Sequence, residues 1–288
     1  MMKTKSQGKQ FLRHLPGYAV LTIWAIFTVF LVVWIFGASL STTREIFKGG
    51  ALKFASGVHF ENYATAWKTQ NVSVFFGNSL LYASIASVLI LVVSAPCAYV
   101  LSRIRFKGNK LIQTSFATSM GVPLVMIILP LFAITTNLGL LKTDLKIRGL
   151  LIFLNTAINI PYTVIFLLSF FSTISTSYEE AAIIDGCTRE KAFWKIMLPL
   201  AQSGIVTVTV FNFLSVWNEY FMSLIFASGQ NVRPVAVGLY SMINSMRYTG
   251  DWAGLFASVV LVFLPTFVLY VLLSNRIIAG ITAGGVKG

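Results

Sequence analysis

The chain has 288 residues, of which 56% are hydrophobic and only 11% are charged. An average soluble protein has roughly 25% charged residues, and a soluble domain of this length needs more polar surface than this composition provides. The mean hydropathy of +0.79 therefore predicts that lipid is the main solvent. The net charge of +13 would by itself also suit a nucleic-acid-binding protein, but the positions of the basic residues argue against that class.

Six stretches of the sequence contain no Asp, Glu, Lys or Arg, and each is long enough for a transmembrane helix of about 20 apolar residues. The basic residues occupy the connections, so a nucleic-acid-binding face would be divided between two sides of a membrane. The sequence thus predicts an all-α polytopic membrane protein with six transmembrane helices. The predicted spans are about 17–40, 74–101, 111–136, 149–171, 203–228 and 252–275.

The basic residues in the connections also predict the orientation. Four of them crowd the turn 102–110, and the loop 179–195 holds more. Cytoplasmic loops carry the excess of Lys and Arg, so we expect these connections, the N-terminal segment 1–16 and the tail 276–288 on the cytoplasmic side. Both termini are then cytoplasmic, as an even number of spans requires.

Proline and glycine interrupt several predicted spans. Such residues are tolerated in a membrane when a neighbouring helix or a water-lined cavity satisfies the freed backbone groups. They favour a bundle that bends or moves, although ordinary enrichment of Gly and Pro in transmembrane helices explains them equally well. The positions are Pro96, Gly121, Pro123, Pro130, Pro161 and Pro265.

Neither a cofactor nor a metal is expected in this chain. Cys97, Cys187, His14 and His59 are the only cysteines and histidines, and their spacing fits no zinc site and makes a disulfide improbable. The sequence also lacks the G-x-x-x-x-G-K-[ST] loop that binds ATP phosphates. Any energy from ATP must come from a partner.

The connection 175–202 after the fourth predicted span contains strong signals for a first short helix. Ser177 and Glu180 have the spacing of a capping box, which predicts a helix that starts just after Ser177. Gly186 can adopt the left-handed conformation that ends a helix. The segment therefore predicts a helix and a sharp turn outside the bilayer.

A second short helix is predicted directly after that turn. Thr188 is its expected N-cap, and Pro199 is expected to interrupt it near the membrane. An exposed, partly apolar helix pair is a candidate docking element, and the alternative is a loop that only connects two spans. Four residues share one face of the second helix: Ala192, Phe193, Ile196 and Met197.

These residues resemble a known family. Glu180-Ala181-Ala182, Asp185-Gly186, Phe193, Ile196 and Pro199 resemble the EAA loop of permease subunits of ATP-binding-cassette (ABC) importers. Trp217-Asn218-Glu219-Tyr220 and the terminal segment 280–288 resemble motifs of the carbohydrate-uptake, maltose-type branch, as do Phe60-Glu61-Asn62-Tyr63 and the basic turn 102–108. The resemblance covers about residues 60–288, with departures at Cys187, where alanine is usual, and Ser203, where a second proline is common.

The resemblance implies the type I importer architecture in a bacterial inner membrane. It implies a non-enzymatic permease subunit that pairs with a second homologous permease. Two copies of a cytoplasmic ABC ATPase would dock on the EAA loops and bind ATP and Mg²⁺, while an extracytoplasmic solute-binding protein would deliver the sugar. The tail 276–288 would be an extended segment that reaches the ATPases.

The same resemblance suggests roles for residues of the loop. Glu180, Asp185 and Gly186 would hold the loop in shape, together with the turn at Pro199. The apolar docking surface for the ATPase would come from Ala181, Ala182 and Phe193.

Polar residues within the fourth and fifth spans are candidates for the translocation pathway. Glu219 is the one acidic residue inside an apolar stretch, where a carboxylate needs a polar partner or cavity. A hydrogen bond that fixes one helix against another is an equally good explanation. The candidates are Asn155, Asn159, Asn212, Ser215, Asn218 and Glu219.

An independent secondary transporter or channel is the alternative function. Ion coupling would call for charge pairs inside the spans, and Glu219 has no cationic partner within a span. A membrane enzyme is less well supported, because no constellation of His, Cys and carboxylate residues exists to host it.

Overall fold

The computed structural model describes the backbone of residues 4–285 and the side chains of residues 14–245, 248 and 250–274. Helices and turns make up the described backbone, which contains no strand, as the sequence predicts. The chain divides into two compact units. One contains residues 1–70 with 242–261, and the other contains residues 71–241 with 262–288.

The first unit is built on the long helix α1 (Thr4–Ser39), which continues the predicted span back through most of the segment 1–16. Two short helices follow, α2 (Thr43–Phe47) and α3 (Glu61–Lys68). The side chain of Thr42 and that of Glu45 cap α2 reciprocally, which satisfies two backbone N–H groups at its start.

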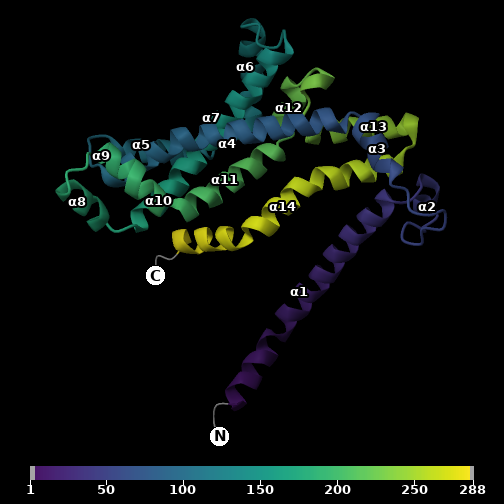
Figure 1. Ribbon diagram of the computed structural model, residues 1–288, viewed down its shortest axis with the longest axis horizontal. Coiled ribbons are helices and arrows are strands. Elements are labelled where there is room, and N and C mark those ends of the chain that lie inside the picture. Colours follow the sequence, from purple (N-terminus) through teal and green to yellow (C-terminus); the bar gives the residue numbers. More distant parts are fainter. Residues whose placement is uncertain (1–3, 286–288) are drawn as a thin grey trace. The chain divides into compact units, whose positions relative to one another are not determined.

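Three long helices form the centre of the second unit: α4 (Val72–Arg103), α7 (Asp144–Thr173) and α11 (Gln202–Trp217). They lie side by side along the unit (Figure 1). One apolar cluster joins the first half of α4 to the first half of α7, and a second joins the later halves of both helices to α11. The three helices therefore share a continuous packed seam.

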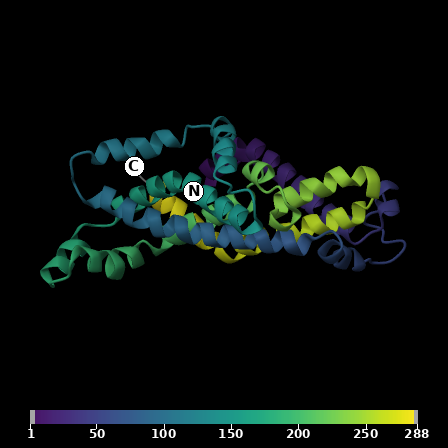
Figure 2. The ribbon, with the colours of Figure 1, turned by 90° about the horizontal axis from the view of Figure 1, so that it is seen from above.

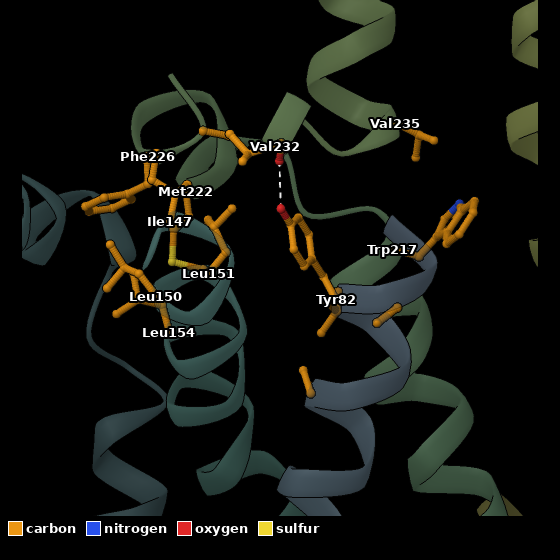
Figure 3. Packing of buried hydrophobic residues seen from close by; sticks show 14 of the residues in the cluster. Tyr82, Ile147, Leu150, Leu151, Leu154, Trp217, Met222, Phe226, Val232 and Val235 are labelled. Carbon is orange, nitrogen blue, oxygen red and sulfur yellow. Dashed lines mark hydrogen bonds between the residues drawn. The ribbon is translucent and has the colours of Figure 1, made fainter. Parts of the chain in front are cut away.

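The first cluster also holds the segment between α12 (Phe221–Phe226) and α13 (Val235–Thr249). The hydroxyl of Tyr82 donates a hydrogen bond of 2.8 Å to the carbonyl of Val232, while Trp217 and Phe226 are buried in the same cluster (Figure 3). The turn η2 (Gln230–Val232) is thereby tied to the beginning of α4.

A glycine allows α11 to approach α7 closely. A Cβ atom on Gly204 would lie 2.6 Å from the ring of Phe170, closer than carbon atoms can approach. Glycine at this position therefore permits the contact between the beginning of α11 and the end of α7.

The third predicted span is broken into two helices, α5 (Asn109–Ser119) and α6 (Leu124–Asn137). They meet at an angle of 93°, and α5 runs back in the direction opposite to the end of α4 (Figure 2). The break holds Gly121 and Pro123, and a residue before proline avoids the helical conformation. The remaining prolines singled out above, Pro96, Pro130, Pro161 and Pro265, lie inside helices.

Four helices of the described chain are long and apolar enough to cross a membrane: His14–Ser39, Val72–Arg103, Asp144–Thr173 and Trp252–Ser274. Two bent pairs, α5 with α6 and Arg189–Leu200 with Gln202–Phe226, raise the number to six. The prediction of six spans thus holds when each bent pair counts as one.

Two parts of the chain differ from the prediction. Helix α13 lies in a stretch that was expected to be only a connection. Helix α14 (Trp252–Gly285) continues through residues 276–285, so the prediction of an extended tail is wrong there. A helix that is already formed gains a hydrogen bond with each added residue, and this carries α14 past the last apolar residue of the span. Residues 286–288 lie outside the described chain.

Candidate functional site

The predicted docking loop begins with helix α8 (Ser177–Ile184). Thr176 is its N-cap residue and makes no side-chain cap, while the hydroxyl of Ser175 accepts a hydrogen bond of 3.3 Å from the N–H of Ser177. The capping box expected for Ser177 and Glu180 is therefore wrong. The hydroxyl of Ser177 is instead hydrogen-bonded to that of Ser175 at 2.8 Å, and the side chain of Glu180 is exposed.

The end of α8 confirms the role predicted for Gly186. This residue has φ of +82°, and its N–H donates to the carbonyl of Ile183 at 3.0 Å. The next N–H, that of Cys187, donates to the carbonyl of Ala182 at 2.9 Å. The two bonds form a Schellman motif, with Asp185 as the C-cap residue, and they fix the sharp turn that follows.

A continuous helical segment runs from the turn to the membrane-spanning helix α11. It consists of α9 (Arg189–Ala192), the π-helical turn η1 (Phe193–Met197) and α10 (Leu198–Leu200). The side chain of Thr188 accepts a hydrogen bond from the N–H of Lys191 at 3.3 Å, as predicted for its N-cap.

Pro199 does not interrupt this segment where expected. The helix continues to Leu200 and then bends by 76° before Gln202. Pro199 lies in the first turn of α10, after a π-helical turn whose wider hydrogen-bonded rings can accommodate a missing N–H donor.

The loop packs against the end of α4 and the end of α7 through one apolar face. Ala182 and Phe193 are buried in that face, and the ring of Phe193 lies 4.8 Å from the ring of Tyr99, measured between centroids. Their predicted role as docking surface is wrong, because burial leaves neither side chain available to a partner, and Phe193 instead attaches the loop to α4 and α7. Ala181, in contrast, is exposed.

The loop also exposes larger apolar side chains that the sequence analysis did not single out. Ile184 is 85% exposed and Trp194 is 58% exposed, and Tyr178 and Ile183 are also exposed. Ile183 lines a cavity beside Arg103 and Glu179, whereas exposed apolar side chains such as Ile184 and Trp194 mark an interaction surface. The available signal was the position of Ile184, which the helical repeat places on the side of the helix away from Ala182.

A buried ion pair connects the loop to the end of α4. The Nε of Arg103 lies 3.2 Å from Oε1 of Glu179, and the two side chains are only 8% and 15% exposed. Arg103 also donates through Nη2 to the carbonyls of Phe171 and Ile174, at 2.8 and 2.5 Å. Sequence reasoning missed this arrangement, because it treated Arg103 only as part of the basic turn.

Two of the predicted pathway residues are buried between helices. Asn212 exchanges hydrogen bonds with the hydroxyl of Thr163 across α11 and α7, at 3.0 and 3.1 Å. Asn155 donates to the carbonyl of Leu151 in its own helix at 2.9 Å. The structure favours the helix-packing alternative for Asn212, which joins α11 to α7, whereas the side chain of Asn155 bonds within its own helix and its pathway role stays a prediction.

Three other predicted pathway residues are more accessible. Ser215 is exposed and donates to Oδ1 of the half-buried Asn159 at 3.1 Å. Asn218 is exposed, and its amide donates to the carbonyl of Leu214 at 2.9 Å. Each retains polar atoms at a surface, so a pathway role for them stays a prediction.

Glu219 lies in the break between α11 and α12. Its carboxylate accepts hydrogen bonds from the N–H of Met222 at 2.6 Å and from the N–H and hydroxyl of Ser223 at 2.9 and 2.6 Å. The carboxylate thus finds the polar partners that the sequence analysis expected among the N–H groups at the start of α12, and no other helix of the described chain supplies one. A pathway role for Glu219 stays a prediction.

Comparisons with known proteins agree on one family. Residues 90–279 match the family described as "Binding-protein-dependent transport system inner membrane component". The diacetylchitobiose uptake system permease protein NgcG of Streptomyces coelicolor is 33% identical over 268 residues, which are 93% of this chain and 87% of the relative.

Two solved structures share the fold. The crystal structure of a bacterial ABC transporter involved in the import of the acidic polysaccharide alginate matches with a TM-score of 0.78 and 22% identity. A crystal structure of a bacterial alginate ABC transporter in complex with an alginate pentasaccharide-bound periplasmic protein matches with a TM-score of 0.68 and 17% identity. Each match covers 93% of this chain and 97% of the other.

Proposed function

Because the chain belongs to the family of binding-protein-dependent transport system inner membrane components, we propose that it is the permease subunit of an ATP-driven importer that carries a sugar. The sugar class is supported by the relative NgcG, a component of a diacetylchitobiose uptake system. The substrate of this chain belongs to that broad chemical class, and the particular sugar is left open.

The proposed complex contains three kinds of partner. A second homologous permease completes the membrane pathway, and a periplasmic solute-binding protein delivers the sugar, which the complex described for the alginate transporter supports. Two copies of a cytoplasmic ATPase bind ATP and Mg²⁺. Both termini of the permease and the loop 175–202 lie on the ATPase side.

The exposed apolar face of the loop carries this proposal. Ile184 and most of the surface of Trp194 lie outside the packed face of α8 and η1, and this exposed apolar surface faces water unless a partner covers it. Covering one such side chain contributes about 1.5–3 kcal/mol before the costs of association. A short apolar ridge fixed by a Schellman turn is a suitable shape for insertion into a groove of the ATPase.

ATP-driven closure of the two ATPases would move the two loops of the permease pair toward each other. A rigid-body change of this kind needs contacts that differ between the two states. Glu180, Asp185 and Gly186 belong to the helix and turn that present the apolar ridge, and Ala181 lies on the exposed side of the same helix.

The replacement Ile184→Asp tests the proposed docking. We expect loss of ATPase co-purification in mild detergent and loss of ATP-driven sugar uptake, because a carboxylate would have to be buried in an apolar groove. Leu145→Asp is the matched control, since Leu145 is 79% exposed at the opposite end of α7, where an acidic residue suits the helix N-terminus. Normal ATPase binding and uptake by Ile184→Asp would contradict the proposal.

A further inference from the structure

We propose that Arg103 is a positioning residue that links movement of the loop 175–202 to helices α4 and α7. This inference rests on the proposed function, because it concerns how force from an ATPase reaches the membrane helices. The guanidinium of Arg103 lies where three elements meet: the end of α4, the end of α7 and helix α8.

The ion pair with Glu179 is the first part of this junction. Nε of Arg103 and Oε1 of Glu179 are both buried and have no hydrogen-bond partner in the described part of the chain, so their separation of 3.2 Å is the contact that compensates both. A buried charge that loses its partner is strongly destabilised. Separating α8 from α4 is therefore unfavourable.

The second part is the contact with α7. Phe171 and Ile174 supply carbonyls from the last turn of α7 and its C-cap position. The carbonyl of Phe171 also accepts from the N–H of Ile174 at 3.2 Å. Both carbonyls lie at the C-terminal end of α7, which carries the negative end of the helix dipole, so a guanidinium is well suited to them. Arg103 is thus fixed to α7 independently of Glu179.

The contacts of Arg103 differ from the apolar packing around them. The planar guanidinium donates its two Nη2 hydrogen bonds to the end of α7 in fixed directions, and the buried ion pair holds Glu179 by charge, whereas apolar contacts such as that of Phe193 with Tyr99 allow sliding. Glu179 lies one and a half turns before Ile184, which is on the proposed docking face. When a partner displaces Ile184, helix α8 would therefore move together with Arg103 and the helix ends that Arg103 contacts.

A nearby residue provides a matched control. Arg189 lines the same cavity of about 230 Å³ as Arg103 and Glu179, but its side chain is exposed. Removing its charge changes the electrostatics of the cavity without removing the ion pair.

The experiment uses the complete complex in nanodiscs, with both permeases, the ATPase and the binding protein. Two quantities are measured: stimulation of ATP hydrolysis by the sugar-loaded binding protein, and sugar transported per ATP hydrolysed. The unmodified complex is measured first. If it shows neither ATPase binding nor ATP-driven uptake, the proposed function fails, and that failure is distinct from any effect at Arg103.

With a functional complex, Arg103→Gln and Glu179→Gln are expected to keep the ATPase bound and to lower both quantities about tenfold, within the 5–150-fold range of typical coupling free energies. The double variant should lose no more than either single variant, because both act on one contact. Arg103→Lys should restore part of the coupling, and Arg189→Gln should leave it unchanged.

A further variant separates coupling from stability. Arg103→Met combined with Glu179→Leu replaces the pair by apolar side chains, which often preserves stability. We expect this double variant to fold and bind the ATPase but to remain uncoupled. Full coupling in this variant, or in Arg103→Gln, would overturn the proposal.

Discussion

Glu179, in the first turn of α8, and Glu219, at the break between α11 and α12, are acidic side chains of an apolar protein that are stabilised in different ways. Glu219 accepts hydrogen bonds from residues three and four positions further along its own chain. Glu179 pairs with Arg103, which belongs to another helix far away in the sequence. The first arrangement is local, while the second joins separate elements.

The difference indicates what each residue controls. A local cap fixes the shape of the segment that contains it, so its loss changes stability near that segment. A long-range pair fixes the position of one element against another, so its loss changes communication between them. Glu45 is a solvent-exposed example of the local kind, because its carboxylate accepts hydrogen bonds from the N–H groups of Thr42 and Ser56.

The largest expected effect is that of Arg103→Ala. This variant leaves the carboxylate of Glu179 buried without a cation and frees two carbonyls of α7, so the free energy of unfolding should fall by about 3–5 kcal/mol. Denaturant unfolding in detergent measures it. The control is Lys107→Ala, because Lys107 is exposed in the same turn 102–110. This variant should change the free energy of unfolding by less than about 0.5 kcal/mol. Equal effects of the two variants would contradict the long-range role that distinguishes Glu179 from Glu219.

Gly186→Val tests whether the turn holds the loop in shape. Valine at φ of +82° is strained, by roughly 1–3 kcal/mol, and we expect the ATPase to detach or uncouple. ATPase co-purification and ATP-driven uptake are the measurements. Gly149→Ala is the control, because a Cβ there meets no atom within 4 Å; normal uptake by Gly186→Val would count against the role of this turn.

Glu219→Gln tests the local arrangement. Glutamine keeps an acceptor but loses the charge, so thermal stability should fall by about 1–2 kcal/mol while the KM for sugar stays unchanged. Asn218→Ala on the adjacent exposed residue should have a smaller effect on stability. A raised KM with unchanged stability would instead assign Glu219 to the translocation pathway.

Two threonine and serine variants refine the comparison at the loop. Thr188→Ala removes an N-cap and should cost about 1 kcal/mol, which amide hydrogen exchange in α9 would detect. Ser177→Ala should leave exchange in α8 nearly unchanged, because the hydroxyl of Ser177 bonds to that of Ser175 and not to an N–H group of the helix. Equal effects at both positions would show that the hydroxyl of Ser177 does cap α8.

The smallest effect concerns Glu45 and pH. Hydrogen bonds from the backbone of Thr42 and Ser56 lower the pKa of Glu45 from 4.5 to about 2. Its contribution is therefore fully present above pH 4.5 and is lost as the pH falls toward 2. The protection factors of the Thr42 and Ser56 amides, which compare the observed exchange rate with the intrinsic rate at the same pH, should fall over that interval, whereas in Glu45→Gln they should lack this pH dependence.

Local features were predicted from the sequence because neighbouring residues determine them. The apolar spans follow from runs without charge, and Gly186 and Thr188 end and begin helices through their own backbone and side chain. Ser177 shows the limit of such reasoning, since a hydroxyl of Ser175 two residues away bonds to it instead.

Features that depend on packing were not predicted. Helical periodicity grouped Phe193 with Ala192 and Met197, but it did not show whether that face met a partner or the protein's own α4 and α7. The pairing of Glu179 with Arg103 likewise depends on how the end of α4 meets the loop. A sequence with two adjacent glutamates, Glu179 and Glu180, does not show which one turns inward.

The close approach of α11 to α7 has a consequence for how this sequence can diverge. Since a Cβ on Gly204 would overlap the ring of Phe170, the two positions share one volume, and an alanine at 204 requires a smaller side chain at 170. Gly238 and the ring of Phe75 are in equally close contact. We expect each pair to covary among relatives, so that substitutions arise together or in a fixed order, aromatic position first.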